Sequence, residues 1–254
     1  MDCVRYTKSF EVYYHEINHR QQVTPAALLN YLGETALSHT KAAGYGLNRL
    51  GLDNKGWVIS RWLLKMEKYP KWEDRVQIET WASLFQRFYA EREFLIKDEA
   101  GNILGRATSL WIFIDITKKR PVSIPEHIKE CYGTYPIKAL DAPFSRLTPP
   151  EGPDIKKKEF TVRLSDIDTN DHVNNSKYVE WLMETIPTEI YNQFLPTCLE
   201  IQYKKEVCYG TKLYACGKQM DKCGTAKKYS HSIYNAYTGV QMALARTVWE
   251  PIAP

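Results

Sequence analysis

An acid, an amide and an imidazole occur at alternate positions in the segment Asp168-Thr-Asn170-Asp-His172. Residues two apart share one face of an extended chain, so we expect Asp168, Asn170 and His172 to project into the same space. Together these groups can accept a proton and orient a water molecule or a carbonyl group, as general acid–base catalysis requires. Their spacing predicts a catalytic cluster just before a helix.

The chain contains the same unit twice, and only one copy carries this cluster. When residues 10–35 are laid over residues 160–185 without a gap, identical residues recur, as at Phe10 and Phe160, Val12 and Val162, and Val23 and Val173. At the three polar positions, however, the first copy has Asn18, Arg20 and Gln22. The sequence therefore indicates a duplicated fold with its chemistry in the second half.

The elements around the cluster follow from the pattern of apolar residues. Residues 10–14 alternate like a half-buried strand, and Thr24 and Pro25 are typical of the start of a helix, which we expect over residues 25–43. Strand-like runs follow at 57–67, 75–83, 88–97 and 103–115. The order then repeats, with a helix over residues 176–186 and strands near 160–164, 199–208, 211–218, 229–236 and 241–249.

One helix and one mostly antiparallel sheet, twice over, predict an α+β architecture. We expect a first unit at residues 1–116 and a second unit at residues 159–254. Prolines gather between them, so residues 117–158 are predicted to form a Pro-rich linker.

Composition excludes several classes of protein. The longest clean apolar stretch, residues 110–114, is far shorter than the roughly 20 residues of a membrane span. A net charge of +4 is smaller than the positive charge expected of a nucleic-acid-binding protein. The start of the chain has no signal or transit peptide, so we expect a cytoplasmic protein with neither a membrane nor a nucleic-acid partner.

Basic residues nevertheless gather in short runs, which can steer an acidic partner toward the protein or can simply be solvated loop ends. The runs are Lys118-Lys119-Arg120, Lys156-Lys157-Lys158, Lys204-Lys205 and Lys227-Lys228.

A zinc-protease pattern, His-Glu-x-x-His, occurs at His15 to His19. That motif binds zinc on a helix, where residues four apart share a face. Here it follows a strand and precedes the predicted helix start, and in a strand the two imidazoles would lie about 13 Å apart. We therefore predict no metal site.

The second-copy segment resembles the signature of the acyl-acyl-carrier-protein thioesterases of the bacterial type. The resemblance covers residues 10–250 and rests on Asn170-Asp-His172-Val-Asn-Asn-Ser-Lys-Tyr178 with Trp181 and Glu184-Thr-Ile-Pro187, on Tyr69-Pro-Lys-Trp72, on Val76-Gln-Ile-Glu-Thr-Trp81, on Gly105-Arg-Ala-Thr-Ser109, and on Tyr203-Lys-Lys-Glu206. It implies a tandem double hot-dog fold, in which each unit is a long helix wrapped by an antiparallel sheet.

Carried over by position, the resemblance implies that Asp168, Asn170, His172 and Glu206 are catalytic. Glu206 or His172 would take a proton from water, and the backbone N–H groups of Val173 and Asn174 would face the carbonyl oxygen at the start of the second helix. The first unit would supply the acyl-chain pocket, with Leu28, Leu32, Ala36 and Trp57 as substrate-binding residues or as ordinary core.

The family resemblance implies hydrolysis of fatty acyl-ACP thioesters to free fatty acid and acyl carrier protein (ACP), which ends fatty-acid synthesis, without a cofactor. An acidic ACP would be the partner, and a homodimer is left open. Two alternatives are a hot-dog thioesterase acting on acyl-CoA and a non-catalytic acyl-binding protein. Some family members have a cysteine directly after the glutamate, where this chain has Val207, with Cys208 one place further on. That shift turns a side chain to the other face of a strand, which favours water over cysteine as the nucleophile.

Overall fold

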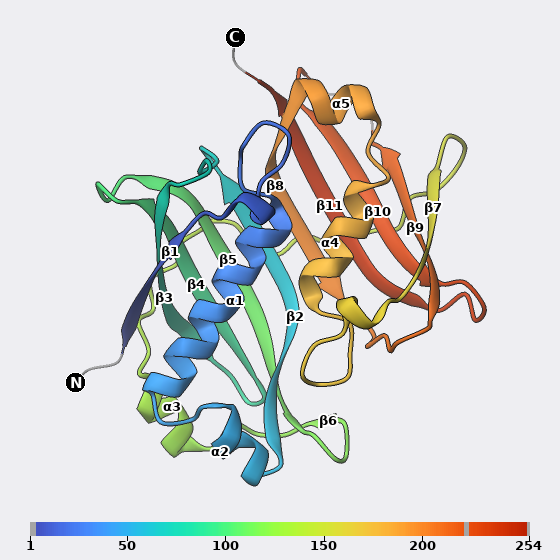
Figure 1. The fold of residues 1–254 in the computed structure, drawn as a ribbon. Coiled ribbons are helices and arrows are strands. Elements are labelled where there is room, and N and C mark those ends of the chain that lie inside the picture. Colours follow the sequence, from blue (N-terminus) through green and yellow to red (C-terminus); the bar gives the residue numbers. More distant parts are fainter. Residues whose placement is uncertain (1–3, 221–223, 253–254) are drawn as a thin grey trace. The chain divides into compact units, whose positions relative to one another are not determined.

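The computed structural model describes residues 4–220 and 224–252. The chain divides into two compact units, Met1–Pro143 and Phe144–Pro254. Each unit consists of an antiparallel sheet with a helix lying across it, which confirms the predicted α+β class (Figure 1). None of the helices formed by the described residues combines the length and apolar character that crossing a membrane requires.

The first unit has a five-strand antiparallel path in the order β1-β3-β4-β5-β2, with β6 paired to β5. Its elements are β1 (Arg5–Glu11), the 3-10 turn η1 (Tyr14–Glu16), α1 (Pro25–Ala42), α2 (Leu47–Leu52), β2 (Lys55–Met66), β3 (Arg75–Phe85), β4 (Tyr89–Asp98), β5 (Ile103–Asp115), β6 (Arg120–Pro121) and α3 (Glu126–Tyr132).

The second unit repeats this order as β7-β9-β10-β11-β8, again antiparallel. Its elements are β7 (Lys156–Thr161), the 3-10 turn η2 (Leu164–Asp166), α4 (Asn175–Met183), α5 (Thr188–Gln193), β8 (Phe194–Tyr203), β9 (Lys212–Gln219), β10 (Lys227–Asn235) and β11 (Gln241–Pro251).

The first helix begins where the sequence predicts. The Thr24 hydroxyl accepts the N–H of Ala27 at 3.2 Å, and Pro25 is the first helical residue. Leu28 and Leu32, one turn apart, are fully buried against the sheet of the first unit. The helical run ends at Ala42, one residue before the predicted end.

The second helix is shorter than predicted. α4 ends at Met183, and a separate helix, α5, begins directly after Pro187. Proline disfavours the helical conformation in the residue before it and lacks the N–H that a continuous helix needs. The Thr185 N–H and hydroxyl both donate to the carbonyl of Leu182, at 3.0 and 2.7 Å, and this tight turn closes α4.

A buried histidine fixes the core of the second unit. The Thr185 hydroxyl donates to Leu182, so the Nδ1–H of His231 donates to the Thr185 oxygen at 3.1 Å. The Thr247 oxygen accepts from the Trp249 indole at 2.8 Å and its hydroxyl donates to Nε2 of His231 at 2.9 Å. His231 is therefore held neutral, and burial lowers its pKa to about 3.

Gly217 makes this packing possible. An added Cβ atom at residue 217 would lie 2.1 Å from the Thr185 hydroxyl oxygen, so only glycine fits under the helix end.

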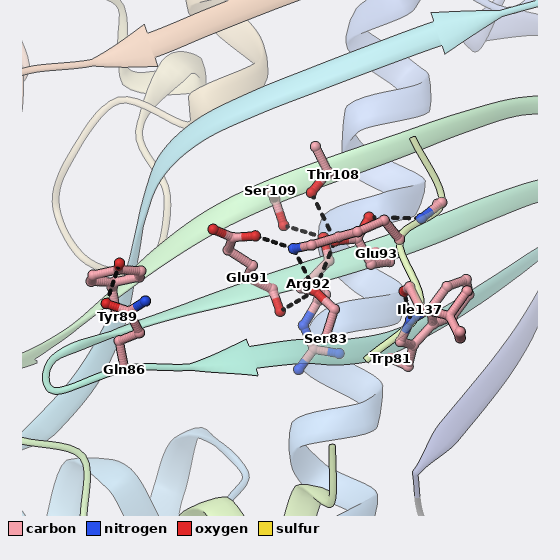
Figure 2. A network of polar contacts seen from close by, with 12 residues as sticks. Trp81, Ser83, Gln86, Tyr89, Glu91, Arg92, Glu93, Thr108, Ser109 and Ile137 are labelled. Carbon is pink, nitrogen blue, oxygen red and sulfur yellow. Dashed lines mark hydrogen bonds and ion pairs between the residues drawn. The ribbon is translucent and has the colours of Figure 1, made fainter. Parts of the chain in front are cut away.

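A buried carboxylate in β4 binds a segment that follows α3 in the sequence. Glu93 is fully buried and accepts hydrogen bonds from Ser83 at 2.8 Å and Thr108 at 3.1 Å (Figure 2). It also accepts the backbone N–H of Ala139 at 3.1 Å and pairs with Lys138 at 3.2 Å. Residues 135–139 therefore belong to the first unit.

Part of the segment predicted as a linker is thus built into the two units. Within residues 117–158, β6 and α3 form, and Ile128 and Tyr132 of α3 are buried in the first unit. In the second unit the buried carboxylate of Glu200 accepts the N–H of Ser145 at 2.7 Å. The proline content suggested an irregular connection, but apolar residues between the prolines have a core to pack against.

Candidate active site

The loop that carries the predicted cluster folds back on itself. The N–H of Asp168 donates to the carbonyl of His172 at 2.8 Å, and Asp171 has a positive φ of 61°. The prediction of an extended segment is therefore wrong here, because the turn removes the alternation of faces.

The first unit contains the same loop. There the N–H of Asn18 donates to the carbonyl of Gln22 at 2.8 Å, and Gln21 has a φ of 59°. Isolated bridges close the two loops at the same places, between Ile17 and Val23 and between Ile167 and Val173. The duplication thus extends to the backbone hydrogen bonds, while the side chains differ.

His172 and Glu206 form the central contact of the candidate site. Nε2 of His172 lies 3.2 Å from Oε2 of Glu206, and both side chains are partly exposed to solvent. An imidazole and a carboxylate in contact at the surface can exchange protons with a bound water molecule. The structure therefore brings together these two of the four residues predicted to be catalytic.

Asp168 and Asn170 contact each other, but mainly as part of the turn. The Asp168 carboxylate accepts the backbone N–H of Asn170 at 2.8 Å. The Asn170 side chain is exposed and makes no hydrogen bond within the described part of the chain. Its amide is available to a ligand, whereas Asp168 shapes the loop.

The predicted backbone donors are already in use. The N–H of Val173 donates to the carbonyl of Val207 at 2.8 Å, and that of Asn174 donates to the carbonyl of Asp166 at 2.8 Å. The prediction that these two groups face a substrate oxygen is therefore wrong for this structure. The loop uses them to fix itself to its neighbours.

The next residue along the chain, Asn175, opens α4. The first N–H groups of a helix have no acceptor within the helix and carry the positive end of its dipole. At the equivalent position of the first unit stands Pro25, which has no N–H at all. A backbone donor at this place is therefore possible only in the second unit.

Glu206 lies on a loop rather than on the predicted strand. β8 ends at Tyr203, and residues 204–208 continue without strand pairing. Val207 is buried, whereas Cys208 is exposed. The expectation that the register of a strand orients Cys208 therefore does not apply. In the described structure, His172 has its ion-pair contact with Glu206 and none with the Cys208 sulfur.

Tyr178 was not predicted to belong to the site, because tyrosine on an apolar helix face resembles core. Its hydroxyl lies 3.4 Å from the carbonyl oxygen of Lys205, the residue before Glu206. Burial, and then the nearby groups Glu206, Cys208 and Asp168, raise the pKa of Tyr178 well above its usual range. The sequence did hold a signal, since the repeat aligns Tyr178 with Leu28.

The residues predicted to bind the acyl chain lie in the first unit. Leu28, Leu32 and Ala36 are buried along one face of α1, and Trp57 packs on Phe113 with ring centroids 4.9 Å apart. The indole N–H of Trp57 is buried without a hydrogen-bond partner in the described residues. Whether these residues bind substrate or only form core stays a prediction.

The zinc-protease pattern is not helical. His15 lies in η1 and stacks on Tyr13, whereas Nε2 of His19 accepts from Arg20 at 3.2 Å. Among the described residues no three acidic, histidine or cysteine side chains are grouped to hold a metal ion.

Fold and site together define a tandem hot-dog protein with a thioesterase-like loop in its second unit. Residues 4–132 match the acyl-ACP thioesterase N-terminal domain, and residues 152–251 match the acyl-ACP thioesterase C-terminal domain. The chain belongs to the acyl-ACP thioesterase family.

Individual relatives agree with this assignment. The chain is 30% identical to a chloroplastic acyl-[acyl-carrier-protein] hydrolase of Cuphea viscosissima, over 98% of this chain and 63% of that protein. It is 27% identical to a chloroplastic palmitoyl-acyl carrier protein thioesterase of Arabidopsis thaliana, over 100% of this chain and 66% of that protein. The chain thus spans just under two thirds of the length of these relatives.

Solved structures share the fold over nearly the whole chain. A 12:0-ACP thioesterase from Umbellularia californica superimposes with a TM-score of 0.85 at 25% identity, covering 98% of this chain and 95% of that one. An acyl-ACP thioesterase from Bacteroides thetaiotaomicron gives a TM-score of 0.84 at 23% identity, covering 97% and 98%.

Proposed function

We propose that this protein hydrolyses fatty acyl thioesters carried on ACP, releasing fatty acid and free ACP and so ending fatty-acid synthesis. One observation carries the proposal: the imidazole of His172 and the carboxylate of Glu206 are in contact, 3.2 Å apart. The equivalent loop of the first unit has Gln22 in place of the histidine. Membership of the acyl-ACP thioesterase family supports the same reaction.

In this proposal water is the nucleophile. The water oxygen attacks the thioester carbon, and Glu206 or His172 accepts the proton that the water loses. The tetrahedral intermediate then expels the thiolate of the carrier, which recovers a proton from the same pair. The products are the fatty acid and the carrier thiol, and the pair returns to its starting state.

The oxyanion of the intermediate needs a donor. Because the N–H groups of Val173 and Asn174 already donate to the carbonyls of Val207 and Asp166, we assign this role to the N–H of Asn175 at the start of α4. The helix dipole favours negative charge there. The exposed amide of Asn170 is a second donor for the same oxygen or for the attacking water, and Asp168 holds the turn that presents it.

ACP as the carrier, cytoplasmic location, and the acyl pocket at Leu28, Leu32, Ala36 and Trp57 are parts of the same proposal. Exposed Lys204 and Lys205 precede Glu206 directly and give the site entrance a positive charge that suits an acidic carrier. A homodimer stays an open prediction.

The test compares carriers. Purified protein is incubated with acyl-ACP and acyl-CoA thioesters of matched chain length, and free thiol and fatty acid are both measured. We expect faster turnover on ACP thioesters. Faster turnover on CoA thioesters would instead identify a hot-dog thioesterase that acts on acyl-CoA. Tight binding of acyl groups without release of thiol would identify an acyl-binding protein instead.

A further inference from the structure

Two positions that are apolar in the first unit carry hydroxyl groups in the second, one of them buried and the other partly buried. On the central helices, the position of Leu28 is taken by Tyr178. On the adjoining strands, the position of Met66 is taken by Tyr203. Met66 pairs with Gly105 in the first unit, as Tyr203 pairs with Ala243 in the second.

The backbone after these strand residues confirms the equivalence. The N–H groups of Glu67 and Lys68 both donate to the carbonyl of Leu104, and those of Lys204 and Lys205 both donate to the carbonyl of Met242. Counting on from there, the counterpart of Glu206 in the first unit is Tyr69. Both tyrosine hydroxyls therefore occur only in the unit that has the His172–Glu206 pair.

Tyr178 reaches the loop that carries Glu206. It is buried, and its hydroxyl donates to the carbonyl of Lys205 at 3.4 Å, one residue before the carboxylate. Burial and the negative groups around it favour the protonated phenol. The hydroxyl is therefore a donor at any pH at which the enzyme would work.

Tyr203 makes a second hydrogen bond near the same loop, at the start of α4. Its hydroxyl donates to the carbonyl of Asn175 at 3.0 Å, at the first residue of α4. Its ring meets the Tyr178 ring edge-on, with centroids 5.3 Å apart. The two phenols thus join the start of α4 to the loop at residues 204–206.

We propose that Tyr178 is a positioning residue, with Tyr203 as its support: its hydroxyl holds the Lys205 carbonyl so that Glu206 stays against His172. This inference rests on the proposed hydrolysis. It predicts that the hydroxyl matters for turnover rather than for folding or for substrate binding, because its hydrogen bond is made to the Lys205 carbonyl of the protein itself.

The first experiment compares Tyr178→Phe with the wild-type protein. We expect kcat on acyl-ACP to fall about five- to tenfold, as for the loss of one hydrogen bond, with KM changed less than twofold. The matched control is Tyr229→Phe, because Tyr229 is also buried in the second unit and its hydroxyl donates at 3.3 Å to Gln219, away from the loop. This control should keep wild-type kcat.

The second experiment is a double-mutant cycle with Glu206→Ala. If Tyr178 acts through Glu206, then Tyr178→Phe has no further effect on kcat in the Glu206→Ala background. Additive losses, or an unchanged kcat in Tyr178→Phe, would overturn the inference. Should Tyr178→Phe fail to fold, Tyr203→Phe enters the same cycle with the same two outcomes. A wild-type protein inactive on every thioester would instead defeat the proposed function, and the inference with it.

Discussion

Gln22 and His172 hold the same backbone position in the two units, since each carbonyl accepts the N–H of the residue four places earlier at 2.8 Å. Only His172 meets a carboxylate, because the counterpart of Glu206 in the first unit is Tyr69. The same backbone conformation thus carries different side chains in the two units. A substitution in the first unit is therefore a matched control for the equivalent substitution in the second.

Replacement of His172 or Glu206 by Ala should lower kcat by roughly 10² or more, the loss typical of a general acid–base group, with little change in folding. Gln22→Ala is the matched control and should leave kcat nearly intact. Steady-state kinetics on acyl-ACP, with circular dichroism for folding, decides the matter. Equal damage from Gln22→Ala would contradict a single site.

Cys208→Ala should retain most of the activity. His172 contacts Glu206, and Cys208 lies exposed on the loop beyond it, so these two residues do not form the cysteine–histidine pair that would generate a thiolate nucleophile. Intact-protein mass spectrometry during turnover is the sharper measurement. An acyl group trapped on Cys208 would replace the water mechanism with a covalent one.

Reversing the charge at Lys204 and Lys205, with both changed to Glu, should lower kcat/KM for acyl-ACP about tenfold through KM and weaken its dependence on salt. Hydrolysis of a small acyl thioester that lacks a protein carrier should change little. Lys156→Glu with Lys158→Glu, exposed on β7 of the same unit, is the charge-matched control. If the control pair lowered kcat/KM for acyl-ACP equally, the loss would be due to net charge alone.

Stability should fall as the pH is lowered, because His231 is buried and neutral. Its pKa is lowered from 6.5 to about 3, so between these values the unfolded chain binds a proton that the folded chain does not. The free energy of unfolding should then drop by about 1.4 kcal/mol per pH unit from this residue. Urea unfolding at several pH values measures the slope. His231→Gln should flatten it, and an unchanged slope would exclude His231 as the cause.

Sequence patterns predicted which elements form, because most of them depend on local periodicity, but the strands predicted at 10–14, 160–164 and 199–208 form earlier, at Arg5–Glu11, Lys156–Thr161 and Phe194–Tyr203. The helix start at Thr24 and Pro25 and the four later strands of the first unit follow from capping and alternation. The end of α4 differed because the tight turn at Thr185 closes the helix before Pro187 is reached.

The site was harder to predict because its geometry depends on hydrogen bonds that no pattern encodes. Asp168 and His172 were expected on one face of an extended segment, but their backbones bond to each other across a turn. The N–H groups of Val173 and Asn174 were predicted to face a substrate oxygen, but they donate to carbonyls of two other segments. Tyr178 was not predicted as a site residue because its ring fits an apolar helix face, and the hydrogen-bond partner of its hydroxyl lies 27 residues further along the chain.

The anchoring of residues 135–139 decides where the first unit can be separated from the rest of the protein. A fragment ending at residue 116, or even at Tyr132, would leave the buried Glu93 carboxylate without the Lys138 ammonium and the Ala139 N–H. It would also leave the indole of Trp81 without the Ile137 carbonyl, its acceptor at 2.8 Å. Uncompensated buried charge is costly enough to unfold a small domain. Domain exchange between relatives should therefore place the junction after Ala139.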